Sequence, residues 1–389
     1  MTDQDAERWR RVQRVLAVRL DNLGDVLMTT PALAAIRRST SGAQITLLTS
    51  PAGAALAPCL PDLDDVIAFD APWVKNADGA GGDEIGRAEA RLIDTLRAQR
   101  FDAALIFTVC TQSSLPAALL CRLAGIPLRA AHSRENPYGL LSDWVRETDE
   151  LGPGMRHEVQ RQLALAASVG YTVDDDGLRL RVTAQQRRRA RTLLHDAGVP
   201  AQRPYFIVHP GASAPSRRYP AARFGSAADS IAARSGCLPV FTGDASEQPL
   251  IDEARRCMSQ PSITLAGRVG VPELAALIGD ARLLLANNTG PAHIAAAVGT
   301  PVTVLYALTN PQHTPWRVAT RVLNHDVPCR DCLKSVCPQG HHDCLMKVES
   351  DDVVRAAIAL LRPRPHDGSV IRTDARQLQY ATYETQGTA

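Results

Sequence analysis

The feature that most constrains the fold is a repeated alternation of short apolar runs with helix-forming stretches. In the first part of the chain, apolar runs of strand length fall at 14–20, 44–50, 65–70, 102–107 and 126–132. The same alternation returns with runs at 205–211, 238–244, 262–267, 281–288 and 300–306. Strands that alternate with helices favour a parallel sheet covered by helices. The sequence therefore predicts an α/β protein built from two such halves.

Chain length supports two domains. The 389 residues exceed the size of about 250–300 residues at which single domains usually stop growing. A helical bridge at 157–170 and an Arg-rich stretch at 183–199 lie between the halves, and the boundary falls near 180–203. We place the first domain at 14–182, the second at 200–348 and a last helix at 349–362. Residues 363–389 lack periodicity and are predicted to form a disordered tail.

Charge and hydropathy exclude several classes of partner. The chain has 43 Lys and Arg against 41 Asp and Glu, a net charge of +2, which gives no basic field for nucleic acid. Residues 1–14 are charged, and no apolar run exceeds strand length, so neither a signal peptide nor a transmembrane segment is expected. We expect a cytoplasmic protein. The Arg-rich segment 8–14 is compatible with peripheral association at the inner membrane.

One turn, within "LLLANNTGPAHIAAAVGTPVTVLY" at 283–306, is typical of an anion site. A strand ends at Asn288, Thr289 and Gly290, and a small-residue helix with an early Pro follows. Such a helix start leaves several backbone N–H groups unpaired, and these groups bind anions well. His293 lies in the same helix. His293 could contribute to this anion site, or it could be a buried histidine that bonds to a structural partner.

Two further turns of the second half carry charged residues. "HPGASAPSRRYP" at 209–220 contains Arg217 and Arg218, and "FTGDASEQ" at 241–248 contains Glu247. Turns after parallel strands meet at one edge of the sheet, where ligands bind. Either arginine could neutralise a diphosphate, and Glu247 could accept hydrogen bonds from ribose hydroxyls. The structural alternative leaves the arginines solvated and makes Glu247 a helix-start residue.

The first strand of the first half ends in a polar turn, "RLDNLGDVLMTTP". Asp21 and Asn22 follow the strand, Gly24 permits a tight turn, and Asp25 stands at the start of the next helix. Asp25 either stabilises the helix dipole or serves as a general base at the ligand-binding edge. The sequence leaves both roles open.

A cysteine-rich segment follows the last strand of the second half. Of nine cysteines, four lie close together in C-x2-C-x4-C-x6-C spacing, namely Cys329, Cys332, Cys337 and Cys344, with His341 and His342 between the last two. This set suits zinc or an iron–sulfur cluster, although the spacing differs from that of a zinc ribbon. Free or reversibly oxidised thiols are the alternative. In either case we expect a structural and not a catalytic role.

Taken together, "VRLDNLGDVLMTTPALAAIR", "HEVQRQLALAASVG", "IVHPGAS", "FTGDASE" and "NNTGPAHIAAAVGTPVTVLYALTNP" resemble glycosyltransferase family 9, the ADP-heptose:lipopolysaccharide heptosyltransferases. The resemblance runs from about residue 14 to about residue 362. It implies the GT-B fold, in which two Rossmann-like domains face each other across a crevice. The acceptor would bind the first domain and the nucleotide-sugar the second, with the helix at 349–362 crossing back.

The resemblance also implies roles for single residues. Asp25 matches the aspartate that takes the proton from the acceptor hydroxyl. The nucleotide-sugar site is expected to comprise Ser213, Arg217, Glu247, Val269, Asn288, Thr289, Gly290 and His293. Arg217 stands where family members carry a lysine, and Asn288 stands where some carry an aspartate. These two departures leave the reaction type unchanged but leave the sugar and any metal requirement open.

The expected function is that of an inverting glycosyltransferase. It would move a heptose from an ADP-activated donor to a lipopolysaccharide core or a related surface glycan at the inner membrane surface. We expect a monomer that needs no cofactor for its chemistry. Two alternatives stay open: another GT-B enzyme, such as an epimerase of a UDP-sugar, and a nucleotide-binding module without catalysis.

Overall fold

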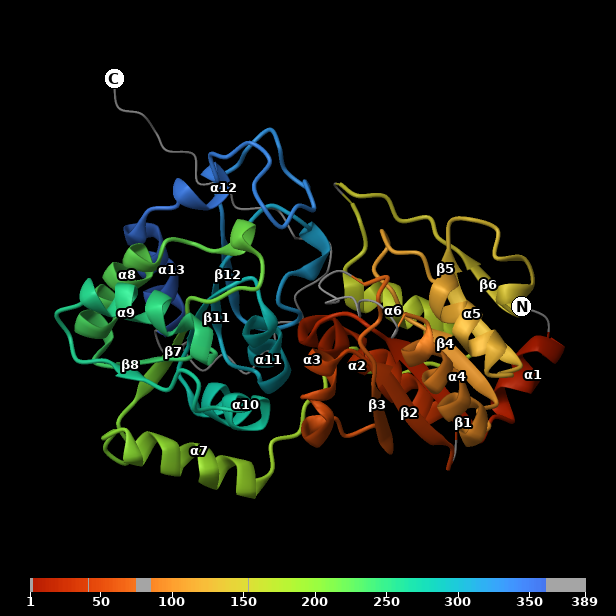
Figure 1. Ribbon diagram of the computed structural model, residues 1–389. Coiled ribbons are helices and arrows are strands. Elements are labelled where there is room, and N and C mark those ends of the chain that lie inside the picture. The colour runs from red at the N-terminus through yellow and green to blue at the C-terminus, as the bar shows by residue number, and fades with distance from the viewer. Residues whose placement is uncertain (1–2, 41, 75–84, 153, 362–389) are drawn as a thin grey trace.

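The computed structural model describes residues 3–40, 42–74, 85–152 and 154–361, and it contains two six-stranded parallel sheets (Figure 1). The first sheet has the order β3-β2-β1-β4-β5-β6 and the second β12-β11-β10-β7-β8-β9. Their strands are β1 Arg14–Arg19, β2 Gln44–Thr49, β3 Asp65–Ala68, β4 Ala103–Ile106, β5 Leu128–Ser133, β6 Asp143–Arg146, β7 Tyr205–His209, β8 Leu238–Phe241, β9 Ile263–Thr264, β10 Leu284–Asn287, β11 Val302–Leu305 and β12 Thr320–Leu323. The predicted α/β class is confirmed.

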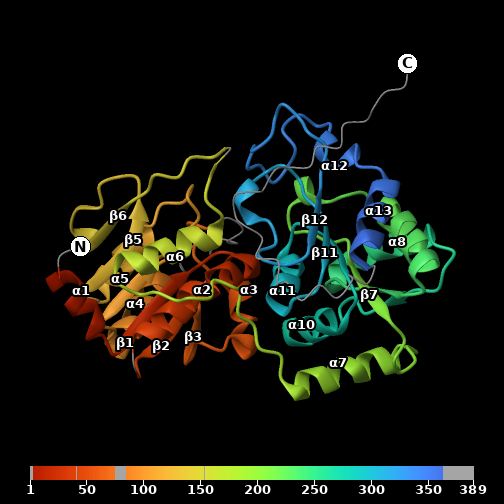
Figure 2. The same ribbon diagram turned by 180° about the vertical axis from the view of Figure 1, so that it is seen from behind.

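Helices cover both sheets, and the two halves lie side by side (Figures 1 and 2). The first half contains α1 Asp3–Arg10, α2 Leu23–Ser39, α3 Pro51–Ala54, α4 Arg87–Gln99, α5 Leu115–Leu123 and α6 Glu158–Ser168. The second contains α7 Ala184–Asp196, α8 Ala221–Ser235, α9 Gln248–Arg256, α10 Val271–Asp280, α11 Gly290–Val298, α12 Asp343–Met346 and α13 Ser350–Leu361. Helix α2 packs against α11, so these two helices join the halves.

The central strands follow directly from their sequence. After Arg14, every residue of β1 is buried, and so is every residue of β10. Parallel strands covered on both faces need such continuous apolar runs. One buried cluster extends from Leu27 of the first half to Ile294 and Val304 of the second. The two halves therefore share apolar packing where α2 meets α11.

Three elements differ from the prediction. Strands β6 and β12 lie at sheet edges and contain charged residues, so they do not stand out as apolar runs. The charged N-terminal segment forms α1, which extends the first half beyond the predicted start at 14. Trp9 of α1 is fully buried, and its carbonyl accepts a hydrogen bond from the Tyr171 hydroxyl at 2.7 Å.

The last helix does not follow the GT-B expectation over its described length. Helix α13 packs against α8, and its residues Val353, Val354 and Ala357 are buried in the core of the second half. Helix α13 therefore belongs to the second half. The return to the first half predicted for 349–362 is not seen up to Leu361. The tail predicted at 363–389 lies outside the described residues. Among the helices that the structure describes, none is both long and apolar enough to cross a membrane.

Candidate active site

The first turns of α2 and α11 meet where the two halves face each other. A Cβ atom added at Gly24 of α2 would come within 2.7 Å of Cδ2 of His293 on α11. A side chain at this position would force the helices apart, which explains why a glycine stands here. The contact places Asp25, the next residue of α2, beside the helix that follows the predicted anion-binding turn.

Asp25 makes the helix-start contact that was one of its two predicted roles, and its geometry leaves the role of general base open. Its Oδ2 accepts a hydrogen bond from the backbone N–H of Asn22 at 3.2 Å, so it does stabilise the helix start. Its Oδ1 lies 3.3 Å from Nη2 of Arg19, and 14 % of its side chain is exposed. One oxygen is thus committed to the helix, while the carboxylate still reaches solvent.

Arg19 holds three carboxylates of the first half together. Its guanidinium is fully buried and lies 3.0 Å from Asp21, 3.3 Å from Asp25 and 2.9 Å from Glu158. Burial alone would lower the pKa of Arg19, but the three carboxylates outweigh it and raise this pKa. Burial would likewise raise the pKa of Glu158, but Arg19 and His313 hold it well below its usual range. The cluster is therefore a pre-assembled ionic support for Asp25.

A cavity of about 300 Å³ opens beside Asp21 at the carboxyl ends of β1 and β4. Apolar groups line much of it, including Trp73 and Phe107, and Thr108 and Gln112 contribute polar atoms. Gln112 donates a hydrogen bond to Asp21 at 2.6 Å. Burial raises the pKa of Asp21 from 3.8 to about 6, although Arg19 opposes this shift. Polar groups on an otherwise apolar wall are typical of a small-molecule site.

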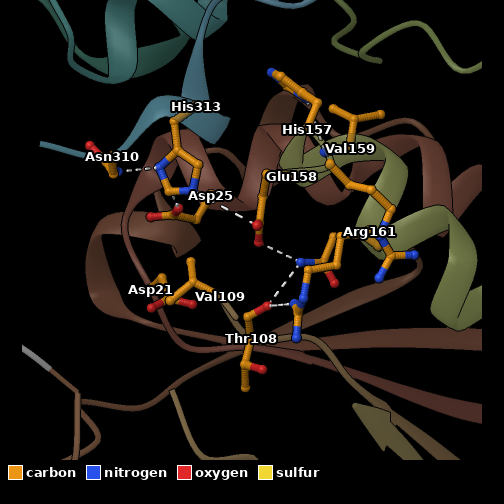
Figure 3. A network of polar contacts seen from close by, with 12 residues as sticks. Asp21, Asp25, Thr108, Val109, His157, Glu158, Val159, Arg161, Asn310 and His313 are labelled. Atoms are coloured by element: carbon orange, nitrogen blue, oxygen red, sulfur yellow. Dashed lines mark hydrogen bonds and ion pairs between the residues drawn. The ribbon is translucent and has the colours of Figure 1, made fainter. Parts of the chain in front are cut away.

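A loop of the second half reaches over this cluster, as Figure 3 shows. His313, at the end of a short turn at Pro311–His313, lies 4.0 Å from Oδ1 of Asp25 and 3.8 Å from Oε2 of Glu158. Asn310 donates a hydrogen bond to Nδ1 of His313 at 2.8 Å. Residues from both halves therefore surround Asp25.

A second contact fixes the same loop to α6. His157 precedes this helix, its Nδ1 accepts from the N–H of Val159 at 3.2 Å, and its Nε2 donates to the carbonyl of Thr314 at 2.8 Å. Its ring stacks on Trp316, with 4.4 Å between the ring centroids. Burial lowers the pKa of His157 to about 4, so the ring is neutral near pH 7.

In the second half, the predicted turns follow the adjacent strands β10, β7 and β8. The side chain of Asn287 joins two of them: its Oδ1 accepts from the N–H of Tyr219 at 3.1 Å, and its Nδ2 donates to the carbonyl of Pro210 at 2.7 Å. Asn288 is buried, and its N–H donates to the carbonyl of Leu305 at 3.1 Å. The structure thus gathers the predicted nucleotide site at one sheet edge.

The two arginines of the β7 turn have different surroundings. Arg218 is exposed, and its Nε donates to the carbonyl of Ala212 at 2.7 Å. Arg217 is half-buried, and its Nε has no hydrogen-bond partner among the described residues. The same holds for Oγ1 of Thr289 and for Nδ1 of His293. Burial lowers the pKa of His293 to about 3, so it is neutral near pH 7.

Glu247 lies against the β7 turn. A Cβ atom at Gly211 would overlap its carboxylate, so the glycine lets the two turns approach. Its Oε2 accepts from the N–H of Asp244 at 3.0 Å, and burial raises its pKa. Ser213 is exposed on the same turn, and Val269 is half-buried after β9. Glu247 therefore lies against the turn that carries Ser213, and Val269 lies one strand further along the sheet.

The cysteine-rich segment contacts the β7 turn. Cys329, Cys332, Cys337 and Cys344 are free thiols of intermediate exposure. In the part of the chain that the structure describes, no three His, Cys, Asp or Glu side chains are arranged to hold a metal. The segment instead supports the β7 turn, because the Ser216 hydroxyl donates to the carbonyl of Lys334 at 2.7 Å.

Three residues of the site were absent from the sequence prediction. Arg19 could have been found from the sequence, because a charged residue within an apolar strand needs a partner of opposite charge. Glu158 follows His157 at the start of a predicted helix, a position that a solvated helix start explains equally well. His313 carried no local signal, since its partners Asp25 and Glu158 lie in the other half of the chain.

Comparison with known proteins agrees with this geometry. The model of glycosyltransferase family 9 (heptosyltransferase) matches residues 89–342. Lipopolysaccharide heptosyltransferase 3 of Escherichia coli is 27% identical over 267 residues, which are 67% of this chain and 73% of that protein. The glycosyltransferase family 9 structure from Veillonella parvula has a TM-score of 0.74 at 22% identity and covers 90% of this chain and 97% of its own. The ADP-heptose LPS heptosyltransferase II of E. coli has a TM-score of 0.69 at 22% identity, with coverage of 90% and 98%. These solved structures confirm the predicted fold, and because the family match spans more than half of the sequence, the chain belongs to glycosyltransferase family 9.

Proposed function

We propose that this glycosyltransferase moves a heptose from an ADP-activated donor to a hydroxyl of a lipopolysaccharide core or related glycan, with inversion. The main support for this proposal is the contact between α2 and α11. It brings the carboxylate of Asp25 in the first half beside the start of α11 in the second half. The relatives named above, a lipopolysaccharide heptosyltransferase and an ADP-heptose LPS heptosyltransferase, support this donor and acceptor. Membership of a transferase family disfavours the epimerase and the non-catalytic alternatives.

The donor diphosphate would bind at the start of α11. Helix N–H groups point toward an anion at this position, and the helix dipole favours negative charge. The hydroxyl of Thr289 and Nε of Arg217 are buried without partners among the described residues, so a phosphate oxygen would satisfy them. Glu247, between the β7 and β8 turns, would accept hydrogen bonds from the ribose hydroxyls.

Asp25 would act as the general base. It takes the proton of the acceptor hydroxyl while that oxygen forms a bond to the anomeric carbon of the heptose. The bond from this carbon to the diphosphate breaks, and ADP leaves with the bonding electrons. Arg217 and the α11 start stabilise the charge that grows on the diphosphate. The leaving group is a weak base, so one carboxylate suffices.

The acceptor would enter through the cavity beside Asp21. Its apolar wall suits the ring faces of a sugar, and Asp21, Thr108 and Gln112 offer hydrogen bonds to hydroxyls. A glycolipid acceptor would bring the protein into peripheral contact with the inner membrane surface, and we propose that it works there as a monomer. The chemistry needs no cofactor. The zinc or iron–sulfur cluster proposed for the four cysteines stays a prediction for metal analysis of the purified protein.

A thermal-shift panel tests the donor. A ligand that binds only the folded state raises its stability, by about 2.7 kcal/mol at a concentration of 100 times Kd. We expect ADP and ADP-heptose to raise the melting temperature more than UDP, GDP and their sugars at equal concentration. A larger shift with a UDP-sugar would contradict the heptose donor while leaving the fold and family unaffected.

A further inference from the structure

The second half places one histidine among the carboxylates that support the base. His313 is 9% exposed (Figure 3). Its Nδ1 faces Oδ1 of Asp25, and its Nε2 faces Oε2 of Glu158. Glu158 is fully buried, and Arg19 contacts both carboxylates. His313 is therefore in a position to influence Asp25 without contacting substrate.

The hydrogen bonds around His313 define its orientation. The Thr309 hydroxyl donates to Oδ1 of Asn310 at 2.9 Å, so the amide Nδ2 of Asn310 faces the ring and donates to Nδ1 of His313. The neutral ring then carries its hydrogen on Nε2, toward Oε2 of Glu158. Both Nε2 and this Oε2 are buried and lack a hydrogen-bond partner among the described residues. Unpaired buried polar atoms are costly, and these two lie 3.8 Å apart.

The same loop is tied to the anion-binding turn. The N–H of Asn288 donates to the carbonyl of Leu305 at the end of β11. The hydroxyl of the next residue, Tyr306, donates to the carbonyl of Asn310. A short path of hydrogen bonds and chain therefore connects the turn proposed to bind the diphosphate with Asn310 and His313.

We propose that His313 is a positioning residue that couples the donor half to the base. A relative shift of the halves by about 1 Å would bring Nε2 of His313 into hydrogen-bonding distance of Glu158. This bond would hold the α11 turn and Asp25 in register for transfer. The proposal goes beyond the function proposed above and rests on the role of Asp25 as base.

The first test replaces His313 in the full-length protein. His313→Leu should lower kcat by about 10–100-fold, because small errors in position cost turnover. ADP affinity and the KM for the donor should stay within about threefold of wild type. His313→Gln should recover most of the lost turnover, since its amide N–H can reach Glu158. His195→Leu, the same change at an exposed histidine of α7, is the matched control and should have no effect.

A double-mutant cycle separates positioning from general damage to the fold. If His313 acts through Asp25, His313→Leu should cost less than about threefold in an Asp25→Asn background. Equal losses in both backgrounds, or no loss in the wild-type background, would overturn the proposal. Wild-type turnover of Asp25→Asn alone would instead show that the proposed base is wrong. If His313→Leu does not fold, Asn310→Leu removes the hydrogen bond that orients His313 and carries the same expectations.

Discussion

The two halves share a sheet topology but treat their polar groups differently. In the first half, Arg19 joins Asp21, Asp25 and Glu158 in a buried cluster, so one guanidinium offsets part of the negative charge of three carboxylates. In the second half, Nε of Arg217 and Oγ1 of Thr289 are buried at the predicted anion-binding turns and have no partner among the described residues, whereas the unpartnered Oε2 of Glu158 in the first half lies 3.8 Å from His313. Native proteins rarely leave such atoms unpaired.

This difference indicates how the halves divide the reaction. A base must be held in one place before the substrate arrives, which a pre-assembled ionic cluster achieves. A site for a charged leaving group gains most when its donors are free to bind that group. The first half therefore orients the base, and the second half binds the anionic leaving group.

The largest expected effect is at Asp25. Asp25→Asn keeps an oxygen for the N–H of Asn22 but cannot accept a proton. We expect turnover to fall by about 10²–10⁴-fold, the usual contribution of a general base, while the ADP Kd stays near wild type. Steady-state kinetics with saturating donor and acceptor, with ADP titration alongside, measures both.

The neighbouring carboxylate supplies the control for this experiment. Asp21→Asn, on the same turn, should reduce turnover by less than about tenfold, because a wall residue of the cavity binds the acceptor but moves no proton. If Asp25→Asn stays within a few-fold of wild type and Asp21→Asn loses activity, the proton goes to Asp21.

The next effect concerns the donor half. Arg217→Ala should lower kcat by about 10²–10³-fold, the scale for removing one group that stabilises developing charge. Arg218→Ala should be mild, because its Nε is already bonded to the carbonyl of Ala212. The same assay compares the two variants. The reverse ranking would assign the diphosphate contact to Arg218.

The smallest effect is a pH dependence of stability. The pKa of Asp21 is raised from 3.8 to about 6, so its protonated form is favoured by folding. That contribution is complete below about pH 4 and is lost as pH rises through 6. Relative to Asp21→Asn, the wild-type protein should lose about 1 kcal/mol of unfolding free energy between pH 5 and 7. Urea unfolding at both pH values measures this, with the exposed Asp94→Asn as control. A constant difference between the proteins would show that Asp21 is not perturbed.

The sequence allowed prediction of the elements that are largely apolar. Strands β1 and β10 are buried and continuous, and the helix starts at Asp25 and Gly290 follow them with polar turn residues. Strand β6, in contrast, begins and ends with a charged residue and lies at a sheet edge, where one side has no neighbouring strand. Periodicity alone does not separate such a segment from a loop.

The contacts between the halves could not be predicted in the same way. The fit of Gly24 against His293 and the position of His313 over Asp25 depend on how two folded units pack together. Neither leaves a local pattern in the chain. The resemblance had already favoured Arg217 over Arg218, but their different surroundings needed coordinates, because adjacent arginines in one turn look alike in the sequence.

In the proposed enzyme, one crevice joins a base from the first half to a sugar-diphosphate site from the second. Incubation of the protein with ADP-heptose and a lipopolysaccharide core that lacks its heptose tests this most directly, with products followed by mass spectrometry. The account predicts one heptose added to the acceptor for each ADP released, with the opposite anomeric configuration to the donor. Release of ADP without heptose on the acceptor, or transfer with retained configuration, would contradict it.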